Sequence, residues 1–398
     1  TQSASCQSRQ AIRRAVKENP GALTAAVGCY AQVYPEHLAE IQGLDLVAGN
    51  RAKLRLPELL DLRERGALPL LPADDDFPSH TFPDHLPVSD RTRAMLKVQD
   101  GCDSFCSYCI VPYARGPVRS LEPPRVIANL KALSDRGYKE VVLTGIHLGR
   151  YGTDLNTSTF LKDLLALIGG EELRPRIRLS SLEPKEISRE LIEMAASEPW
   201  LCRHFHIPLQ SGDDRILKRM NRNYTSQDFR LLVEAIHARV PLAAIGVDIL
   251  AGFPGEDEKA YLATYNLVKD LPVSYCHVFP FSPRKGTPAW TFPDKVPVRE
   301  IRKRAVGLRS LGEEKRKAFY EFCVGKTFDV LSEGWDQKGL LVNGLSDNYV
   351  PVSFPSSKLS HNEMVRVRIE RVDGKMVHGA RCTGHGEMQE RKEPNEIG

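Results

Sequence analysis

The sequence of 398 residues lacks the features that mark membrane-spanning and secreted proteins. No run reaches the roughly 18 apolar residues that a membrane helix needs, and no basic segment followed by an apolar one opens the chain. Nine cysteines are too few for a disulfide scaffold. The formal net charge is only +4, so charge alone does not indicate a nucleic-acid partner. We therefore expect a cytoplasmic protein without a membrane partner.

The composition that remains is typical of a folded chain of two or three domains. Hydrophobic residues make up 41% and charged residues 27%, which excludes wholesale disorder. Residues 1–66 predict a small α/β domain, and because the chain begins with Thr we expect this domain to be truncated. Residues 67–93 hold five prolines and the acidic run 74–76 without periodicity, which predicts a linker.

The next part, residues 94–320, alternates strand-like and helical stretches. Helical patterns separate the strand-like runs and extend over 298–322. The spacing predicts a parallel sheet curled into a partial (β/α)₆ barrel, short of the eight units of a complete one. The predicted strands are 95–99, 140–145, 176–182, 204–209, 244–250 and 275–281.

Short alternating strands separated by Gly and Asn turns fill residues 321–382 and predict a small β-barrel. In the run MVRVRIERV, Val365, Val367 and Ile369 fall on one face, and Arg366 and Arg368 fall on the other. The polar tail 383–398 is predicted to be disordered. The overall expectation is an α/β fold with a truncated N-terminal domain, a partial barrel and a C-terminal β-barrel.

Three cysteines within eight residues are the strongest chemical signal. Cys102, Cys106 and Cys109 have C-x₃-C-x₂-C spacing, and the loop that carries them follows the first predicted barrel strand. A structural zinc site needs four ligands, and no histidine lies between His85 and His147. Three thiolates on a 4Fe–4S cluster leave one iron open for a substrate or cofactor. We favour the cluster, with a zinc-stabilised RNA-binding module as the alternative.

This spacing after the first strand of a barrel resembles the radical S-adenosylmethionine (SAM) enzymes, with Tyr108 in the aromatic position before the last cysteine. The resemblance implies that the open iron chelates the amino and carboxylate groups of SAM. It also implies that reduction of the cluster cleaves SAM to a 5′-deoxyadenosyl radical. The protein then has to position the cofactor and exclude water.

Further motifs resemble the methylthiotransferases within that group, and most closely the MtaB type. The resemblance implies methylthiolation at C2 of N6-threonylcarbamoyladenosine, at position 37 of a tRNA anticodon stem-loop. Two SAM molecules are implied, one for the methyl group and one for the radical. An electron donor such as flavodoxin or ferredoxin, and a monomeric state, are expected too. The motifs are KVQDGCDSFCSYCIVPYARGPVRS (97–120), LTGIHLGRYG (143–152), RLSSLEP (178–184), HIPLQSGDDRILKRMNRNYT (206–225), DILAGFPGEDE (248–258) and VFPFSPRKGTPA (278–289).

The same family binds a second, auxiliary 4Fe–4S cluster through three cysteines of its N-terminal domain. AAVGCYAQ (25–32) matches the third of these ligands at Cys29, and the first two would precede residue 1. One cysteine cannot hold a cluster alone. Cys6 stands where the family has a non-ligand helix start, so we do not expect it to replace a ligand.

The resemblance assigns further residues to SAM. Tyr108, Gly145, Glu183, Gln210, Ser211 and Asp248 are candidate cofactor contacts. Each has a plainer interpretation: a turn glycine for Gly145, a surface acid for Glu183, a helix cap for Ser211, strand packing for Asp248. His206 is expected to be a satisfied strand histidine. Cys202, Cys276, Cys323 and Cys382 are expected to be core or incidental thiols.

Basic residues near the strand ends are candidates for tRNA phosphates as a set. They are Arg115, Arg119, Lys218, Arg219 and Arg222. The C-terminal barrel with its basic face resembles the TRAM domain, an RNA-binding module. Two other functions stay open: methylthiolation of prenylated adenosine 37 or of a ribosomal protein, and non-catalytic tRNA binding by a relative that lacks the auxiliary cluster.

Overall fold

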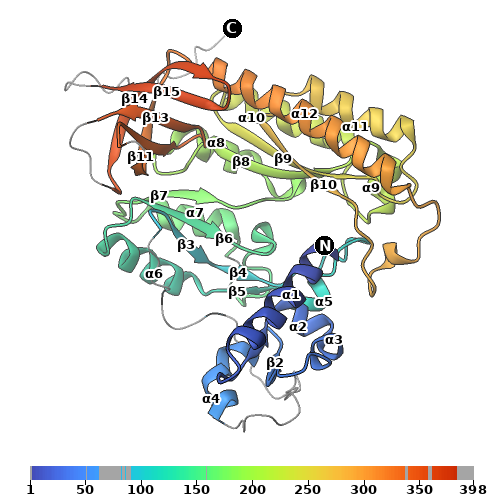
Figure 1. Cartoon of the computed structure of the whole chain (residues 1–398). Helices are drawn as coiled ribbons and strands as arrows, with labels where there is room; N and C mark the ends of the chain where they lie inside the picture. Colours follow the sequence, from blue (N-terminus) through green and yellow to red (C-terminus); the bar gives the residue numbers. More distant parts are fainter. Residues whose placement is uncertain are drawn as a thin grey trace.

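The computed structural model describes residues 2–50, 52–61, 82, 86, 91–157, 159–336, 339–356 and 361–382. The predicted tail 383–398 lies outside the described residues, as does the predicted linker apart from residues 82, 86 and 91–93. Within the described part, no helix is long and apolar enough to span a membrane. Figure 1 shows an N-terminal α/β part, a central curved pair of sheets and a C-terminal barrel.

The N-terminal part packs helices around a two-stranded parallel sheet, β1 (Ala25–Val27) and β2 (Leu46–Ala48). Its core is a small cluster that includes Ala26, Leu38 and Val47. Apolar residues at helical spacing supply the side chains that cover the sheet. The surrounding elements are α1 (Gln2–Glu18), α2 (Cys29–Val33), α3 (Pro35–Ala39), the 3₁₀ turn η1 (Ala52–Arg55) and α4 (Leu56–Asp61).

Two three-stranded parallel sheets form the central part. The first has the order β3 (Ala94–Lys97), β6 (Glu140–Thr144), β7 (Arg176–Leu179), and the second has the order β10 (Tyr275–Pro280), β9 (Ala244–Ala251), β8 (His204–Gln210). A parallel bridge between Ile177 and Leu201 joins their edges. The result is an open six-stranded half-barrel, which confirms the predicted partial (β/α)₆ barrel.

Amphipathic helices cover the outside of the half-barrel and bury their apolar faces against it. Side-chain caps set several of their starts: Ser188, Asp213, Thr225 and Asp257 each accept a hydrogen bond from a first-turn amide. The helices are α6 (Pro123–Asp135), α7 (Leu161–Gly169), α8 (Arg189–Ser197), α9 (Asp214–Arg219), α10 (Ser226–Arg239), α11 (Glu258–Asp270) and α12 (Val298–Phe322), with short turns η3 (Leu148–Arg150), η4 (Pro184–Glu186) and η5 (Pro288–Trp290).

A short ribbon interrupts the first βα unit and was not predicted. Strands β4 (Gln99–Asp100) and β5 (Arg119–Ser120) pair antiparallel, with helix α5 (Val111–Arg115) between them. Each strand has only two residues, too few for any period to appear in the sequence. The ribbon brackets the loop that carries the three clustered cysteines.

The C-terminal part is a closed five-stranded barrel, as predicted, in the order β11-β12-β13-β15-β14. Val365, Val367 and Ile369 point into its core, and Arg366 and Arg368 are exposed. The strands are β11 (Thr327–Trp335), β12 (Leu341–Ser346), β13 (Pro351–Pro355), β14 (Met364–Asp373) and β15 (Met376–Arg381).

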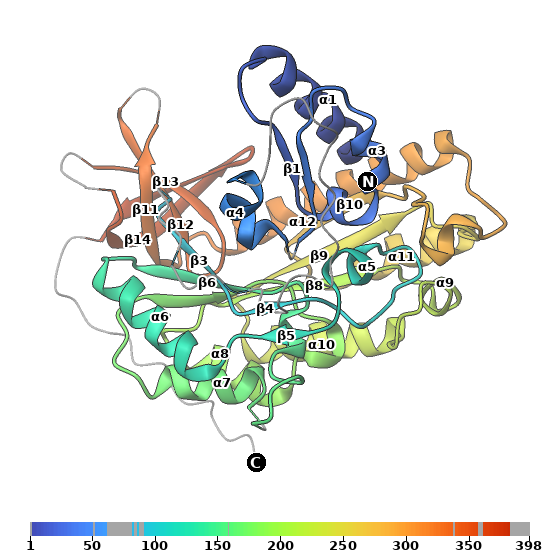
Figure 2. The ribbon, with the colours of Figure 1, turned by 90° about the horizontal axis from the view of Figure 1, so that it is seen from below.

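Buried arginines on β7 attach this barrel to the half-barrel. Arg176 donates to the carbonyl of Asp329 at 2.7 Å, and Arg178 donates to the carbonyl of Ser346 at 3.0 Å. Both arginines also pair with the fully buried carboxylate of Glu140 on β6. The C-terminal barrel therefore sits at the start of the half-barrel strands. The N-terminal part packs near α5, after the strands have ended (Figure 2).

Candidate functional site

The three clustered cysteines lie on one loop between β4 and α5, at the carboxyl end of the first strands. Gly101 opens the loop at φ 77°, and a Cβ there would lie 1.8 Å from the carbonyl oxygen of Pro117, so only glycine fits. Phe105 also adopts a left-handed conformation, at φ 44°. The backbone of the loop therefore makes tight bends at Gly101, before Cys102, and at Phe105, before Cys106.

The segment after α9 holds this loop from the opposite sheet. Ser107 donates its hydroxyl to the carbonyl of Arg219 at 2.9 Å. The amide of Asn221, itself at φ 60°, donates to the carbonyls of Ser104 and Phe105 at 3.2 and 3.1 Å. The second half of the barrel therefore fixes the position of a loop that the first half carries.

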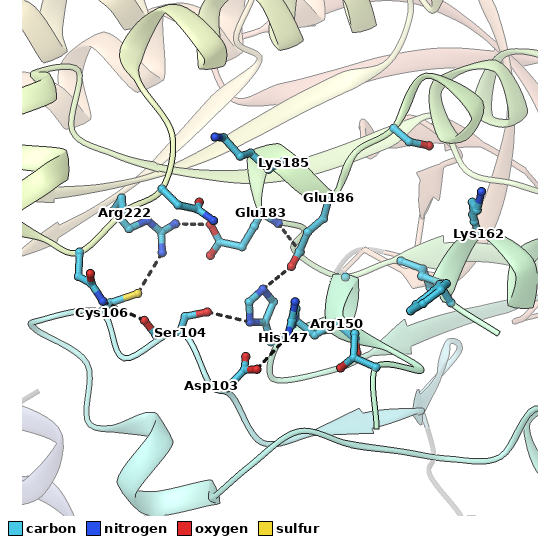
Figure 3. A pocket seen from close by; sticks show the side chains of 17 residues that line it. Asp103, Ser104, Cys106, His147, Arg150, Lys162, Glu183, Lys185, Glu186 and Arg222 are labelled. Atoms are coloured by element: carbon cyan, nitrogen blue, oxygen red, sulfur yellow. Dashed lines mark hydrogen bonds and ion pairs between the residues drawn. The ribbon is translucent and has the colours of Figure 1, made fainter. Parts of the chain in front are cut away.

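Cationic side chains contact two of the three sulfurs, and Figure 3 shows the contact between Arg222 and Cys106. Arg222 donates to Cys106 Sγ at 3.2 Å and forms an ion pair with Glu183. His147 Nδ1 lies 3.4 Å from Cys102 Sγ, and its Nε2 forms an ion pair with Glu186 at 2.5 Å. Positive charge beside a sulfur stabilises the thiolate, which is the form that binds metal.

The pKa values of this group show the same coupling. Burial opposes the charge on His147, but its bonds to Cys102 and Glu186 outweigh burial and raise the pKa of His147 to about 10. Burial raises the pKa of the Cys102 thiol, yet the hydrogen bond from His147 leaves that pKa below its usual value. At neutral pH the site therefore holds a protonated His147 next to Cys102, whose thiol loses its proton more easily than an ordinary cysteine thiol.

The donor set fits an iron–sulfur cluster better than zinc. With Zn–S bonds of about 2.3 Å, the sulfurs of a tetrahedral zinc site lie about 3.8 Å apart. Among the described residues, the one group of three His, Cys, Asp or Glu donors within 4.8 Å of one another is His206, Asp248 and His277, so the three cysteines are spread more widely than zinc requires. Three spaced thiolates suit the larger 4Fe–4S cluster.

A cavity of about 680 Å³ adjoins Cys106 and is lined by Glu183, Arg222 and His147 (Figure 3). This volume lies within the range of cofactor sites. Burial raises the pKa of Glu183 although Arg222 opposes the shift. Of the predicted cofactor contacts, the structure places Glu183 in the cavity that Cys106 also lines. Beside Cys106, this cavity therefore offers a carboxylate, Glu183, and two cationic groups, Arg222 and His147.

The other predicted contacts do not line this cavity. Tyr108 is packed edge-on against Phe253, with ring centroids 6.3 Å apart. Gly145 packs against Gln99: a Cβ at position 145 would lie 2.7 Å from Gln99 Oε1, so a larger residue would not fit without a shift. Gln210 ends β8 in a left-handed conformation at φ 61°. Ser211 is buried with its hydroxyl 3.4 Å from Thr264 Oγ1, and Asp213 rather than Ser211 caps α9.

Asp248 lines a second cavity, of about 830 Å³, on the inner face of the half-barrel. Its Oδ1 lies 2.8 Å from His206 Nε2 and 3.4 Å from His277 Nδ1. Burial opposes its ionisation, but the hydrogen bonds from these histidines lower the pKa of Asp248 to about 2. His206 is indeed a hydrogen-bonded strand histidine, as expected. Two imidazoles and a carboxylate are also a donor set that divalent metals use.

Cys29 begins α2, and Cys6 lies exposed on α1. The amide of Asn50 donates to Cys29 Sγ at 3.4 Å and to the carbonyl of Ala114 at 2.7 Å. Ala114 belongs to α5, directly after the cysteine loop. One asparagine thus links Cys29 to the helix that follows Cys109.

Of the basic set expected to face RNA, one residue is buried and two others form ion pairs. Arg222 was included in that set, but the structure buries it against Cys106 and Glu183, where it cannot reach a phosphate. Arg115 lies 3.6 Å from Asp100, and Arg219 lies 3.5 Å from Asp294. The sequence marks a basic residue but not its partner, and the partner decides whether the charge is available.

Sequence reasoning missed His147 and Glu186 as site residues. The resemblance implies a Gly-Gly-Glu motif at Gly145-Ile146-His147, and this triplet has a histidine in place of the acid. In the structure, the carboxylate is Glu186, on η4 of the next βα unit, and His147 links it to Cys102. A histidine two residues after the end of the predicted strand 140–145 was the available signal.

Comparison with known proteins agrees with the site. The Radical SAM superfamily domain matches residues 96–268. A Bacillus subtilis protein named threonylcarbamoyladenosine tRNA methylthiotransferase MtaB is 36% identical over 369 residues, 91% of this chain and 82% of the relative. An Aquifex aeolicus protein of the same name is 38% identical over 362 residues, 85% of this chain and 86% of the relative.

A Dictyoglomus thermophilum protein named tRNA-2-methylthio-N(6)-dimethylallyladenosine synthase is 34% identical over 363 residues, 90% of this chain and 82% of the relative. All three identities extend over most of each chain, well beyond the cysteine motif. Of these three relatives, the two named MtaB have the higher identities. The chain therefore belongs to the MtaB-type methylthiotransferase family of radical SAM proteins.

Proposed function

We propose that this protein is a tRNA methylthiotransferase that converts N6-threonylcarbamoyladenosine at tRNA position 37 to its 2-methylthio derivative. The observation that carries the proposal is the cysteine loop with Cys106 facing a cofactor-sized cavity, in a chain 36% and 38% identical to MtaB relatives. The predicted substrate and the predicted cofactors follow from the same family.

The chemistry explains the need for a radical cofactor. The C2–H bond of adenine is strong and not acidic, so no general base in this site can remove its proton. When bound, the 4Fe–4S cluster and SAM supply reducing power and a carbon-centred radical. Cys102, Cys106 and Cys109 are the thiolates that hold the cluster. His147 favours the thiolate form of Cys102, Arg222 donates a hydrogen bond to Cys106 Sγ, and Glu183 lies where it can contact bound SAM.

We also propose that Cys29 is one ligand of an auxiliary cluster. Its link through Asn50 to α5 supports this role, because a cluster at Cys29 then lies beside the loop of the radical cluster. Sulfur insertion needs the two clusters close together. Because one cysteine cannot hold a cluster alone, the test is anaerobic iron analysis of the protein together with any residues that precede Thr1: about four irons per chain indicate one cluster, and about eight indicate two.

The proposed partners follow from the substrate. The anticodon stem-loop of tRNA is the substrate, and the C-terminal barrel, with exposed Arg366 and Arg368, is the proposed TRAM-like RNA-binding module. A flavodoxin or ferredoxin supplies electrons. A cytoplasmic location and a monomeric state go with this activity.

The test is an anaerobic reaction of the reconstituted protein with SAM, a reductant and tRNA that carries threonylcarbamoyladenosine. Digested nucleosides are then weighed, with dimethylallyladenosine tRNA in a parallel reaction. We expect a methylthio gain on the threonylcarbamoyl nucleoside. A gain on the dimethylallyl nucleoside alone would assign the other substrate. Formation of 5′-deoxyadenosine without any gain would keep radical chemistry and reject sulfur insertion by this chain.

A further inference from the structure

The second cavity, of about 830 Å³, occupies the inner face of the half-barrel and is not used by the cysteine site. Every strand of both parallel sheets contributes to its wall, and Tyr349 and His361 of the C-terminal part close it. Side chains alternate along a strand, so His204 and His206 of β8 both face inward. The inside of this half-barrel is therefore a chamber whose wall carries both apolar and polar side chains.

A chain of hydrogen bonds runs along one wall of this chamber. Asp248 Oδ1 lies 2.8 Å from His206 Nε2, and His206 Nδ1 lies 3.1 Å from the hydroxyl of Tyr275. That hydroxyl lies 2.8 Å from His204 Nε2. Gly246 makes room for the chain, because a Cβ there would lie 2.1 Å from the Tyr275 ring.

The chain ends in a buried atom that has no partner among the described residues. His204 is stacked on Tyr349 with ring centroids 4.4 Å apart, and its Nδ1 makes no hydrogen bond. Burial holds the pKa of His204 well below its usual value, so the ring is neutral. The hydroxyl of Ser180, on the loop after β7, is likewise buried without a partner. Both residues line the chamber, and buried polar atoms normally have partners.

Hydrogen-bonding groups give the kind of ligand that fits. Arg93 pairs with Glu333 at 2.9 Å and Arg178 pairs with the buried Glu140, so these two arginines add no unpaired charge to the chamber. Four histidines and Ser180 also line it, and this lining suits a small substituent that carries carbonyl, carboxylate and hydroxyl oxygens. An apolar group would leave His204 Nδ1 and Ser180 Oγ unsatisfied. The arginines of the lining are Arg91, Arg93 and Arg178, and its carboxylates are Asp248 and Glu333.

The chamber adjoins the proposed SAM cavity. Ser181 lines the chamber and Glu183 lines the cavity beside Cys106, so the two are separated by about 7 Å of extended chain. On the other sheet, Phe279 lines the chamber, and two residues later Phe281 contacts Phe253, which contacts Tyr108 of the cysteine loop. A nucleoside whose ring faces the cysteine loop can therefore extend a substituent into the chamber.

We propose that this chamber binds the N6 substituent of the target adenosine and selects threonylcarbamoyl, with its carboxylate and hydroxyl, over an apolar prenyl group. This inference rests on the proposed function. His204 and Ser180 complete their hydrogen bonds with the substituent, and His277 lies where it can face the carboxylate. These residues position and select the substrate, and they take no part in the radical step.

The alternative occupant is a metal ion at His206, Asp248 and His277, whose donor atoms lie within 4.8 Å of one another. In the structure these three groups already satisfy one another by hydrogen bonds to Asp248 Oδ1. The unpartnered atoms belong to His204 and Ser180 instead. The chamber therefore requires a ligand that bears hydrogen-bonding groups.

The test measures RNA affinity of the full chain without reductant. Three anticodon stem-loops differ only at position 37: threonylcarbamoyladenosine, dimethylallyladenosine or adenosine. His204→Gln removes the δ nitrogen and keeps a polar atom at the ε position, where it can bond the hydroxyl of Tyr275. The matched control, His204→Asn, keeps a polar atom at the δ position. We expect His204→Gln to lower the preference for the threonylcarbamoyl RNA over the dimethylallyl RNA by about tenfold. His204→Asn should retain more of that preference.

A second pair of variants protects the test against misfolding. His277 is half-exposed, so substitutions there are tolerated by the fold. His277→Glu places a negative charge beside the expected carboxylate and should also lower the preference about tenfold, whereas His277→Gln should change it little. Affinity for the unmodified RNA should stay constant in all four variants.

Three results would overturn the inference. They are an unchanged preference in both His204→Gln and His277→Glu, an equal loss on all three RNAs, or a preference that a chelator abolishes and Zn²⁺ restores. Methylthiolation by the unaltered chain is measured as well, because it shows whether the chamber assignment or the proposed function has failed. Methylthiolation of the threonylcarbamoyl RNA with any of these results rejects only the chamber assignment. Absence of that product rejects the function, and the inference with it.

Discussion

Cys106 is the buried member of the three clustered cysteines, and its sulfur accepts a hydrogen bond from Arg222. We expect Cys106→Ala to abolish SAM cleavage, because two thiolates cannot retain a 4Fe–4S cluster that three hold. The measurement is 5′-deoxyadenosine formed per chain under reducing conditions, together with iron content. Cleavage at the rate of the unaltered protein would reject the cluster assignment.

Cys6→Ala is the matched control for that experiment. Cys6 is exposed on α1, and it is not expected to bind a cluster. The control variant should keep the iron content and the rate of SAM cleavage. Loss of iron in Cys6→Ala would instead make Cys6 a ligand.

Single residues show where sequence reasoning succeeds and where it stops. The cysteine spacing is local and can be recognised in the sequence, so Cys102, Cys106 and Cys109 could be predicted as cluster ligands without a structure. The link from His147 to Glu186 joins two βα units 39 residues apart in the sequence. The position of Arg222 could not be predicted for the same reason: the packing of the two halves of the half-barrel brings it to its partners Cys106 and Glu183.

At the scale of elements, the strands and helices of the half-barrel were predictable because each has a clear period. Helix α12 covers Val298–Phe322, the stretch that was expected to be helical. The β4–β5 ribbon was missed because two-residue strands have no period. The cap of α9 was misassigned between Ser211 and Asp213, since both residue types cap helices and only the contact with Thr264 distinguishes them.

The buried ion pairs between Glu140 on β6 and the two arginines on β7 predict a large effect on stability. Burial would raise the pKa of Glu140, but Arg178 and Arg176 outweigh burial and lower that pKa to about 2. Glu140→Gln leaves two buried arginines without their counter-charge, and we expect it to lower the free energy of unfolding by about 3–5 kcal/mol at pH 7. Urea unfolding of both proteins measures the difference.

The same pair predicts a pH dependence. A carboxylate with a lowered pKa stabilises the fold above its unfolded pKa near 4.5 and loses that contribution as pH falls toward 2. The difference in stability between the unaltered protein and Glu140→Gln should therefore shrink between pH 4.5 and 2. Glu193→Gln, which breaks the exposed pair with Arg239, is the control and should cost less than about 1 kcal/mol. A constant difference across this pH range would contradict the assignment.

At the scale of the whole molecule, the two flanking parts approach opposite ends of the half-barrel. The N-terminal part contacts α5 next to the cysteine loop through Asn50. The C-terminal barrel closes the inner chamber with Tyr349 and His361, and Arg178 anchors it. The half-barrel alone therefore lacks one wall of the proposed substrate chamber. The sequence predicted three parts in order but could not show that two of them share one cavity.

The exposed face of β14 supplies the prediction at this scale. Arg366 and Arg368 alternate with core residues and point to solvent, where they can contact RNA phosphates. We expect the double variant Arg366→Glu/Arg368→Glu to weaken binding of all three stem-loops equally, because phosphate contacts carry no base information. The slope of log affinity against log salt should fall in magnitude by about two, one for each lost contact.

Lys303→Glu on α12 is the control, since Lys303 is also exposed but lies away from the C-terminal barrel. It reverses one charge and should leave the salt slope unchanged. An unchanged slope in the arginine double variant would remove β14 from the RNA surface. A loss confined to the threonylcarbamoyl RNA would place these arginines at the modified base instead. Equal weakening on all RNAs, beside selective weakening in the His204 and His277 variants, would separate the surface that binds tRNA from the chamber that selects the nucleoside.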